Sequence, residues 1–375
     1  MDIIANALFI AEIVLIWAIL TVIQFPIRKE EHRVIRTIVF LLKLILVPLI
    51  AILSVSIDWR MAYTYNDLLL AFYVALIGDI VASVIEYLVR RVRTSVDGND
   101  DLRHRFDNRI GIPLGLSVCI IVLVLSSVYA ETMHMDVHQW QADGLEQEHT
   151  FAFAADLHVG SSLSADSLMD FCRQINESDA EFLILGGDIT DELTSYESMI
   201  DTYRILSTIH IPIYLIYGNH DRQPCADYVG GRTYSDEQLL NAIENAGITL
   251  LKDEYVQVAS DLVLLGREDI SVGDARKDYT ELVNPFTTGA LIVADHQPFD
   301  EEQLENGIFA LQLSGHTHAG QIWPLMAIYS MLHLPVYGEY GYPGTLLYVT
   351  PGLCGWAPPV RTEAHSGWEL ITLCP

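Results

Sequence analysis

The stretch Gly315-His316-Thr317-His318 follows the apolar run 309–313 and is one of five clusters that decide the fold. In each cluster, side chains able to bind metals come directly after a short apolar run that is typical of a β-strand. The other four clusters are Asp156-Leu157-His158, Gly187-Asp188-Ile189-Thr190-Asp191, Gly218-Asn219-His220-Asp221 and Asp295-His296. Loops beyond the carboxyl ends of strands line the ligand crevice of α/β sheets, so we expect the five clusters to meet at one site. Asp, His and Asn side chains suit first-row divalent metal ions.

Strands and helices alternate around these clusters, which indicates an α/β fold. Helices are expected at about 164–176, with Ser164 as the N-cap, and at about 194–209. The expected strands are 150–155, 182–185, 213–217, 262–265, 291–294, 309–313, 345–349 and 369–373. The polar stretch 131–147 is expected to be a linker, and residues 148–375 one folded domain.

The order of the clusters resembles the signature of the calcineurin-like metallophosphoesterase superfamily, which is D-x-H, G-D-x-x-D, G-N-H-(D/E), a later H and G-H-x-H. The resemblance covers about residues 150–373. It is greatest to a bacterial membrane-anchored branch with an extended G-H-T-H-G-G-Q motif and a late Gly-Leu-Gly…Pro-x-Arg segment. This chain departs from that branch at Ala319 and Cys354, neither of which is a ligand position. The resemblance implies a sandwich of two mixed β-sheets flanked by helices.

The same resemblance implies two divalent metal ions, which are Mn, Fe, Zn or Mg in different family members. The residues implied to hold them are Asp156, His158 and His318 for one ion, Asn219, His296 and His316 for the other, and Asp188 as the bridge. Two ions bring four positive charges against two carboxylates, so the site would attract a phosphate despite the acidic domain. Ions about 3.5–4 Å apart lower the pKa of a bridging water, and the expected reaction is in-line attack of that hydroxide on phosphorus.

Beside the ligands, we expect four residues to assist the reaction. His220 follows Asn219 and is expected to protonate the leaving group or to stabilise the charge of the transition state. The resemblance implies that Asp191 orients His220 and raises its pKa, and a carboxylate at a helix start is the alternative. Arg267 is a candidate contact for the substrate phosphate, with a surface role as the alternative. Asp221 is expected to support the site without binding a metal.

Four apolar runs precede the domain, at about 3–25, 37–57, 68–89 and 110–130. Each approaches or exceeds the ~20 residues with which a helix crosses the ~30 Å hydrocarbon core of a bilayer. They are apolar on nearly all sides, whereas helices of a soluble bundle carry a polar stripe. Residues 1–130 are therefore predicted to be a four-helix transmembrane anchor. Four ionisable residues fall inside or near the apolar runs: Glu12, Lys43, Asp79 and Glu86. They are expected either to pair inside the bundle or to line a pathway for an ion or headgroup.

Charge divides the chain at the same place. Residues 1–130 hold 12 of the 21 Lys and Arg and 12 of the 49 Asp and Glu, so the remaining 9 basic and 37 acidic side chains give the rest of the chain the whole net charge of −28. No basic stripe remains outside the anchor, which argues against nucleic acid as a partner. Basic residues gather in the first and third connections between the apolar runs, so we expect these in the cytoplasm and the acidic domain on the extracytoplasmic side of the cell membrane.

The sequence thus predicts a membrane-anchored, metal-dependent phosphoester hydrolase. A phosphodiesterase or pyrophosphatase acting on a lipid-linked or envelope substrate is the favoured interpretation, because the site would be held near the bilayer. A phosphomonoesterase or nucleotide phosphatase is the enzymatic alternative. Two non-hydrolytic hypotheses also fit the sequence. One is a sensor that binds a phosphorylated ligand without cleaving it, and the second is a transporter that the outer domain regulates.

Overall fold

A computed structural model describes residues 111–224, 226, 231–282, 289–306, 309–323, 325–356 and 360–375. The chain divides into two compact units, residues 2–127 and, with Met1, residues 128–375. The first three expected spans lie outside the described residues, as do Lys43, Asp79 and Glu86. The fourth coincides with helix α4 (Gly111–Glu131). Within the described ranges, no helix is both long enough and apolar enough to cross a bilayer.

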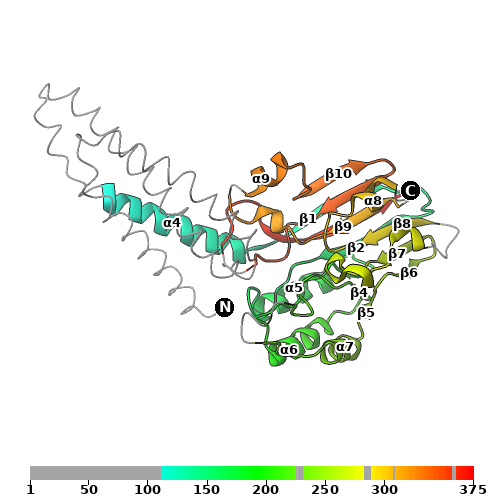
Figure 1. The fold of residues 1–375 in the computed structure, drawn as a ribbon, viewed down its shortest axis with the longest axis horizontal. Helices are drawn as coiled ribbons and strands as arrows, with labels where there is room; N and C mark the ends of the chain where they lie inside the picture. Colours follow the sequence, from blue (N-terminus) through cyan, green and yellow to red (C-terminus); the bar gives the residue numbers. More distant parts are fainter. Residues whose placement is uncertain are drawn as a thin grey trace, which may run out of the picture. The chain divides into compact units, whose positions relative to one another are not determined.

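Two mixed, six-stranded sheets form the frame of residues 128–375 (Figure 1). The strands of the first sheet, in spatial order, are β1 (Met133–Gln141), β12 (Ser366–Cys374), β2 (His149–Ala154), β3 (Leu183–Leu185), β4 (Ile213–Leu215) and β5 (Thr249–Leu250). Those of the second are β10 (Gly338–Tyr342), β11 (Thr345–Val349), β9 (Leu311–Ser314), β8 (Ala290–Ala294), β7 (Leu262–Gly266) and β6 (Glu254–Ala259). In each sheet, four adjacent strands run parallel, from β2 to β5 and from β7 to β11, so their carboxyl ends share one edge.

The stretch 131–147 is not the linker that the sequence predicted, because it contains β1. This strand pairs in parallel with β12 from Met133↔Ser366 to Gln141↔Cys374. Its exposed residues alternate with half-buried ones along most of its length. A strand with mostly polar residues is stable at this position because it is an edge strand with one face turned to solvent.

The alternation of Phe and Ala in β2 shows how the first sheet separates two cores, because successive side chains of a strand point to opposite faces. Phe151 and Phe153 belong to a core between the two sheets, together with residues of the second sheet such as Leu264. Ala152 and Ala154 belong to the core on the outer face. The small alanines leave room there for helices to pack close to the sheet.

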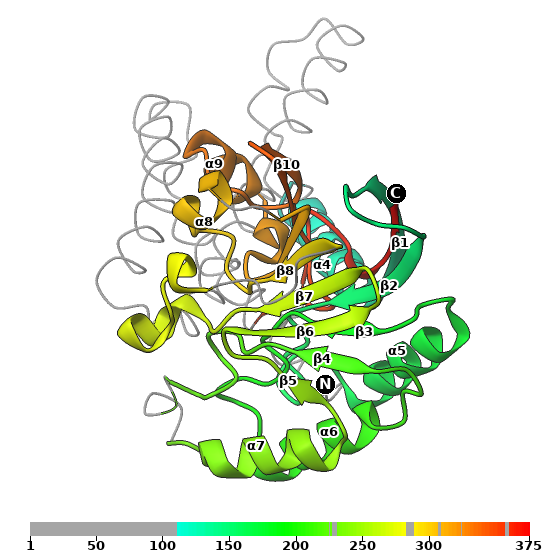
Figure 2. The ribbon, with the colours of Figure 1, turned by 90° about the vertical axis from the view of Figure 1, so that its right-hand side faces the viewer.

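Helices α5 (Ala165–Glu177), α6 (Tyr196–Leu206) and α7 (Asp236–Asn245) cover this outer face of the first sheet (Figure 2). Each begins after a serine whose side chain accepts a backbone N–H from the first turn. Ser164 is one of these serines and is the N-cap that the sequence predicted. The expected helices at 164–176 and 194–209 are therefore confirmed, the second with shorter bounds.

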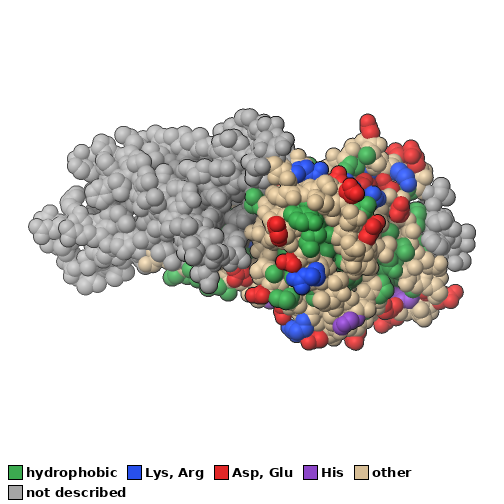
Figure 3. Space-filling model, turned by 90° about the horizontal axis from the view of Figure 1, so that it is seen from below, with side chains coloured by type: hydrophobic (Ala, Val, Ile, Leu, Met, Phe, Trp, Pro, Cys, Tyr) green, Lys and Arg blue, Asp and Glu red, His purple; other side chains and the backbone are tan. Residues whose placement is uncertain are grey.

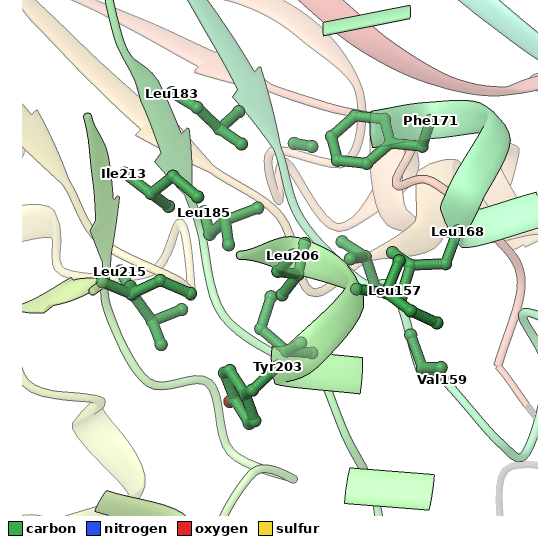
Figure 4. Packing of buried hydrophobic residues seen from close by; sticks show 14 of the residues in the cluster. Leu157, Val159, Leu168, Phe171, Leu183, Leu185, Tyr203, Leu206, Ile213 and Leu215 are labelled. Carbon is green, nitrogen blue, oxygen red and sulfur yellow. The ribbon is translucent and has the colours of Figure 1, made fainter. Parts of the chain in front are cut away.

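The helices and the sheet meet through large apolar side chains (Figure 4). Phe171 and Leu168 of α5 and Tyr203 of α6 are buried against strand residues such as Leu185 and Leu215. Burial of such side chains contributes roughly 1.5–3 kcal/mol each. This core fixes the positions of β2, β3 and β4, whose carboxyl ends lead into three of the five clusters.

The described helices that follow strands of the second sheet are shorter than those that cover the first. Helix α8 (Glu301–Asn306) buries Leu304 against two residues of β11. A short 3-10 helix, η8 (His318–Gly320), follows β9, and helix α9 (Leu325–Met331) comes next. All eight expected strands are present, β11 with the expected ends and the other seven with shifted ends. The strands β1, β5, β6 and β10 and the helices α7, α8 and α9 were not expected.

Candidate metal centre

The five clusters converge at the edge where the parallel strands of both sheets end. The predicted ligands follow their strands in this order: Asp156 and His158 after β2, Asp188 after β3, Asn219 after β4, His296 after β8, His316 and His318 after β9. The convergence that the sequence predicted is therefore confirmed. Six of these side chains form two groups with ligand atoms within 4.8 Å of one another: Asp156, His158 and His318, and Asp188, His296 and His316.

In the first group, one ring nitrogen of each histidine, Nδ1, faces a residue outside the group, and we call it the outer nitrogen. His158 Nδ1 lies 3.2 Å from Asp191 Oδ2 without hydrogen-bond geometry, and its buried Nε2 likewise has no hydrogen-bond partner among the described residues. His318 Nδ1 donates to the carbonyl oxygen of Cys354 at 3.1 Å. Its Nε2 therefore carries a lone pair, 3.7 Å from Asp156 Oδ1. Such neighbours set the tautomer and orientation of metal-binding histidines.

In the second group, the histidines are oriented by a backbone carbonyl and a side-chain amide oxygen. His296 Nδ1 donates to the carbonyl oxygen of Gly186 at 2.8 Å. Its Nε2 lies 3.2 Å from Asn219 Oδ1, and His316 Nδ1 lies 2.8 Å from the same amide oxygen. The amide of Asn219 therefore joins the two histidines, as a shared ligand of one ion would.

Asp188 lies between the two groups. Its Oδ2 is 3.1 Å from His296 Nε2 in the second group and 3.9 Å from His158 Nε2 in the first. Its Oδ1 accepts the backbone N–H of His220 at 2.8 Å. The carboxylate is thus oriented with one oxygen toward both groups, which is the position that a bridging ligand needs.

The donor atoms fit a pair of cations. His296 Nε2, Asp188 Oδ2 and Asn219 Oδ1 meet with no proton between them when Nδ1 carries the ring proton. Converging acceptors repel one another unless a positive charge lies among them. Burial lowers the pKa of His296, but Asp188 and Asp156 outweigh this effect and raise that pKa well above its ordinary value. The group therefore favours positive charge, and a divalent cation would supply it.

The backbone of the clusters is strained in the way that functional sites often are. Five predicted ligands have φ between 42° and 71°: Asp156, His158, Asp188, His316 and His318. This left-handed conformation costs roughly 1–3 kcal/mol for a non-glycine residue and persists only where the surroundings impose it. Glycines make the close packing possible, because a Cβ at Gly218 would clash with Asp188 and one at Gly315 with Asp156.

Asp221 supports the site, as the sequence predicted, by joining the loops that follow β3 and β4. Its carboxylate accepts backbone N–H groups at 2.8–3.1 Å from Gly218, Asp188, Ile189 and Thr190. Four donors around one buried carboxylate hold the two loops in a fixed relation. Asp188 is therefore positioned by the chain before any ligand binds.

His220 lies beside the two groups, but its partner is not the one that the sequence predicted. Its Nδ1 lies 2.7 Å from Glu192 Oε2, and its ring packs against that of Trp356 with centroids 5.4 Å apart. Asp191, expected to orient His220, instead contacts His158 and accepts the hydroxyl of Ser161. The turn after Asp188 directs these two adjacent carboxylates to different histidines.

Arg267 is not available to a substrate, so the prediction that it contacts the substrate phosphate is wrong. Its side chain is 1% exposed and pairs with Asp253 Oδ1 at 2.6 Å. Its other amino group donates to the carbonyl oxygen of Lys277 at 2.9 Å. A buried guanidinium is stable only when paired, and Asp253 and the Lys277 carbonyl provide these partners inside the domain.

Sequence reasoning missed the role of Arg361, although the residue lies in the late Pro-x-Arg segment. The guanidinium is buried and donates to four backbone carbonyls, including those of Cys354 at 2.7 Å and Pro351 at 2.6 Å. The carbonyl of Cys354 is the one that accepts Nδ1–H of His318. Arg361 thus holds the loop that orients a predicted ligand.

Residues 149–320 match the calcineurin-like phosphoesterase family. This part of the chain is a calcineurin-like phosphoesterase domain. It includes all five clusters, and the family is one of metal-dependent phosphoric ester hydrolases. The resemblance read from the clusters is therefore confirmed at the level of the family, whereas the bacterial membrane-anchored branch stays a prediction.

The domain is similar to curated proteins from distant organisms. An uncharacterized metallophosphoesterase of Helicobacter pylori J99 is 28% identical over 241 residues, which are 62% of each chain. A transmembrane protein with metallophosphoesterase domain from Danio rerio is 27% identical, covering 58% of this chain and 52% of its own. Phosphodiesterase YaeI of Escherichia coli is 27% identical, covering 45% and 60%. The chain spans about three-fifths of the length of the Helicobacter relatives that it matches.

Proposed function

We propose that this chain is a metal-dependent hydrolase of phosphodiester or pyrophosphate bonds, anchored in the cell membrane with its phosphoesterase domain on the extracytoplasmic side. The observation that carries the hydrolase is the place of Asp188. One of its oxygens lies 3.1 Å from a ring nitrogen of His296 and 3.9 Å from one of His158. A carboxylate in this position can hold two cations side by side, which is the centre that many phosphoesterases use.

The residues that would hold the cations are Asp156, His158 and His318 for the first, Asn219, His296 and His316 for the second, and Asp188 for both. When bound, two divalent ions activate a water molecule and neutralise the charge of the phosphate. The chain itself fixes the geometry in advance, because the strained loops, Asp221 and Arg361 hold the ligands in place. Such preorganisation avoids the cost of rearranging the ligands during the reaction.

His220 would supply the proton for the leaving oxygen. Burial lowers the pKa of His220, but Asp188 and Glu192 outweigh it and raise that pKa to about 9. Glu192 occupies Nδ1, which leaves Nε2 as the atom that can donate a proton. Bound cations would lower this pKa again, so the ring would be able to lose its proton during turnover. A positioned general acid contributes typically 10²–10⁴-fold to a rate.

Two observations favour diesters over monoesters. The part of the chain beyond residue 130 carries the whole net charge of −28, and a negative surface repels a doubly charged monoester more than a singly charged diester. The relative YaeI is named a phosphodiesterase. A monoesterase is the enzymatic alternative, and a direct comparison of the two kinds of substrate separates them.

The membrane location is supported by the sequence of the first 130 residues. Four apolar runs of spanning length and two Arg-rich connections favour four helices with the domain outside. The Danio rerio relative is named a transmembrane protein. A site tethered near the outer leaflet favours a lipid-linked or envelope phosphoester as substrate.

The test uses detergent-purified full chain, stripped with a chelator and reloaded separately with Mn, Zn, Mg or Fe. Hydrolysis of bis-p-nitrophenyl phosphate is compared with that of p-nitrophenyl phosphate, for the unchanged chain and for His220→Ala. Metal-dependent cleavage that prefers the diester and falls in the variant supports the proposal. Preference for the monoester would replace it with the phosphomonoesterase. Two bound metals per chain without turnover of either compound would favour the sensor.

A further inference from the structure

The segment that follows the last cluster has no charged side chain. Between Gln321 and Glu339 the sequence contains no Asp, Glu, Lys or Arg, although the part of the chain beyond residue 130 holds 37 acidic side chains. Helix α9 lies in this segment. Its residues Leu325, Met326 and Ile328 are half-buried, so the helix itself rests on the domain.

Large apolar side chains are exposed just before the helix and at its end. Trp323, before α9, is 61% exposed, and Met331 and Leu332, at its end, are 80% and 63% exposed. We call these three side chains the α9 patch. Single exposed apolar residues are common on soluble proteins, whereas these three lie within ten residues of one uncharged segment, which makes the segment a candidate for an interaction surface.

Other exposed apolar side chains differ in their surroundings. Met169 and Ile200, which are 49% and 37% exposed, are each followed in sequence by an aspartate. On the face shown in Figure 3, hydrophobic side chains are interspersed with Asp and Glu. The α9 patch differs from these residues because it has no acidic neighbours in the sequence. An anionic partner surface requires such a patch, because acidic side chains would repel it.

The segment is tied to the rim of the metal centre. Trp323 donates its backbone N–H to Thr362 Oγ1 at 2.8 Å, and Met326 donates to Glu363 Oε2 at 2.9 Å. Gln321 Oε1 accepts the backbone N–H of Trp356 at 2.9 Å. Trp356 in turn packs on the ring of His220. The α9 patch is thus connected by short contacts to the residues beside the proposed proton donor.

We propose that the α9 patch docks on a lipid bilayer and presents the metal centre to the phosphate of a membrane-borne substrate. Tryptophan is enriched at membrane interfaces, and Met and Leu side chains gain free energy by entering the acyl region. An uncharged segment can approach anionic headgroups that would repel the acidic remainder of the domain. The four apolar runs of the same chain would keep a bilayer within reach at high effective concentration.

The docking is tested without reference to catalysis, because the substrate part of this inference rests on the proposed function. Full chain and Trp323→Phe are reconstituted in phosphatidylcholine nanodiscs, with and without lipids brominated on the acyl chains. The difference between the two fluorescence signals isolates Trp323 from the other tryptophans. Quenching of this difference by bromine supports docking, and an unquenched difference overturns it.

The substrate part is tested by two diesters with the same leaving group. Phosphatidyl-p-nitrophenol in nanodiscs releases p-nitrophenol and phosphatidic acid with one water, and bis-p-nitrophenyl phosphate is its soluble counterpart. The double variant Met331→Ser, Leu332→Ser is expected to lower kcat/KM for the lipid diester roughly tenfold and to leave the soluble diester unchanged. The matched control is Met169→Ser, Ile200→Ser, which is expected to change neither value.

An equal effect of the two double variants on the lipid diester would overturn the substrate part. If the chain cleaves neither diester, the proposed function fails and the bromine experiment alone decides the docking. If Met331→Ser, Leu332→Ser instead changes the oligomeric state in detergent and Trp323 is not quenched, the α9 patch binds a second copy of the chain and the proposal is wrong.

Discussion

The two halves of the metal centre are held in place by different means. In the first group, the outer nitrogens of His158 and His318 depend on the carboxylate of Asp191 and on the Cys354 carbonyl that Arg361 fixes. In the second group, the outer nitrogen of His296 depends on a backbone carbonyl of the loop after β3. The first half can therefore be weakened by side-chain substitutions that leave every ligand intact. The orientation of His296 cannot be weakened in this way, because no side-chain substitution removes the backbone carbonyl that its Nδ1 contacts.

Substitution of the residue shared by both halves is expected to have the largest effect. Asp188→Asn removes the carboxylate that lies between the groups and should lower the affinity for both ions by more than the roughly 10–100-fold that loss of an outer partner costs. Activity should fall to that of the stripped chain. Metal content by mass spectrometry checks this, with the exposed Asp179→Asn as control. Two retained ions and full activity would refute the bridging role.

His220→Ala is expected to separate catalysis from metal binding. The variant should keep both ions, because His220 belongs to neither group, and should lose roughly 10²–10⁴-fold in kcat. The exposed His210→Ala is the control and should behave like the unchanged chain. Loss of either ion in His220→Ala would show that the ring supports the metal centre and would remove the case for a proton donor.

Asp191→Asn tests the difference between the two halves directly. The first ion should bind roughly 10–100-fold more weakly while the second is unaffected. Glu192→Gln, at the next position, should keep both ions and lower kcat, since Glu192 contacts His220 instead. Metal titration and kinetics of both variants check this. The opposite pattern would restore the sequence-based assignment of Asp191 to His220.

Arg361→Lys should have a smaller effect of the same kind. A lysine cannot reproduce the planar fork that reaches four carbonyls, so the loop carrying the Cys354 carbonyl should loosen. We expect the first ion to bind a few-fold more weakly, below the roughly tenfold of a direct outer partner. Arg267→Lys is the matched control, because Arg267 is equally buried but its guanidinium contacts Asp253 and the Lys277 carbonyl and no residue of the first group. Equal loss of the first ion in both variants would contradict this.

The smallest effect is expected at a buried histidine outside the centre, and it depends on pH. His149 lies 2.9 Å from Glu181 Oε2 and 2.7 Å from Asp261 Oδ1. Burial lowers the pKa of His149, but the hydrogen bonds to Glu181 and Asp261 outweigh it and raise that pKa. Burial raises the pKa of Asp261, but backbone N–H donors and His149 lower it to about 2.

The raised pKa of His149 gives stability that is complete below its ordinary pKa of 6.5 and is lost as pH rises through the folded pKa. The lowered pKa of Asp261 gives stability that is present above 3.8 and is lost as pH falls toward 2. His149→Gln should therefore lower the free energy of unfolding by about 1–2 kcal/mol between pH 3.8 and pH 6.5, and by less at alkaline pH. Thermal unfolding at pH 5.5 and 9 measures this, with His210→Gln as control. An equal loss at both pH values would contradict the ionic contribution.

The sequence predicted the centre well because its signals are local. Each ligand lies two to four residues after the end of an apolar strand, and strand ends are visible in the sequence. The assignment of Asp191 to His220 was wrong, because the turn between β3 and α6 decides which carboxylate reaches His220, and that carboxylate is Glu192. The sequence misjudged Arg267 for a similar reason, because the direction of that side chain depends on Asp253, from which it is separated by two strands, β6 and β7, and the turn between them.

The strand β1 was missed for a different reason. Its residues His134, Asp136 and His138 give the stretch a polar composition that is typical of a linker. The stretch becomes a strand because β12, more than two hundred residues later, offers nine consecutive pairing positions. A pairing between such distant segments leaves no trace in the composition of either one.

The position of β12 also determines the order in which the first sheet can assemble. This strand follows all the others in the chain, yet it lies between β1 and β2. Until it has been synthesised, β2 has one open edge and β1 has no partner in the sheet. Closure of this sheet must therefore be a late step of folding, and one that is slowed by the long loop that it closes. During this interval, the exposed edge of β2 is a place where the newly made chain depends on protection from aggregation.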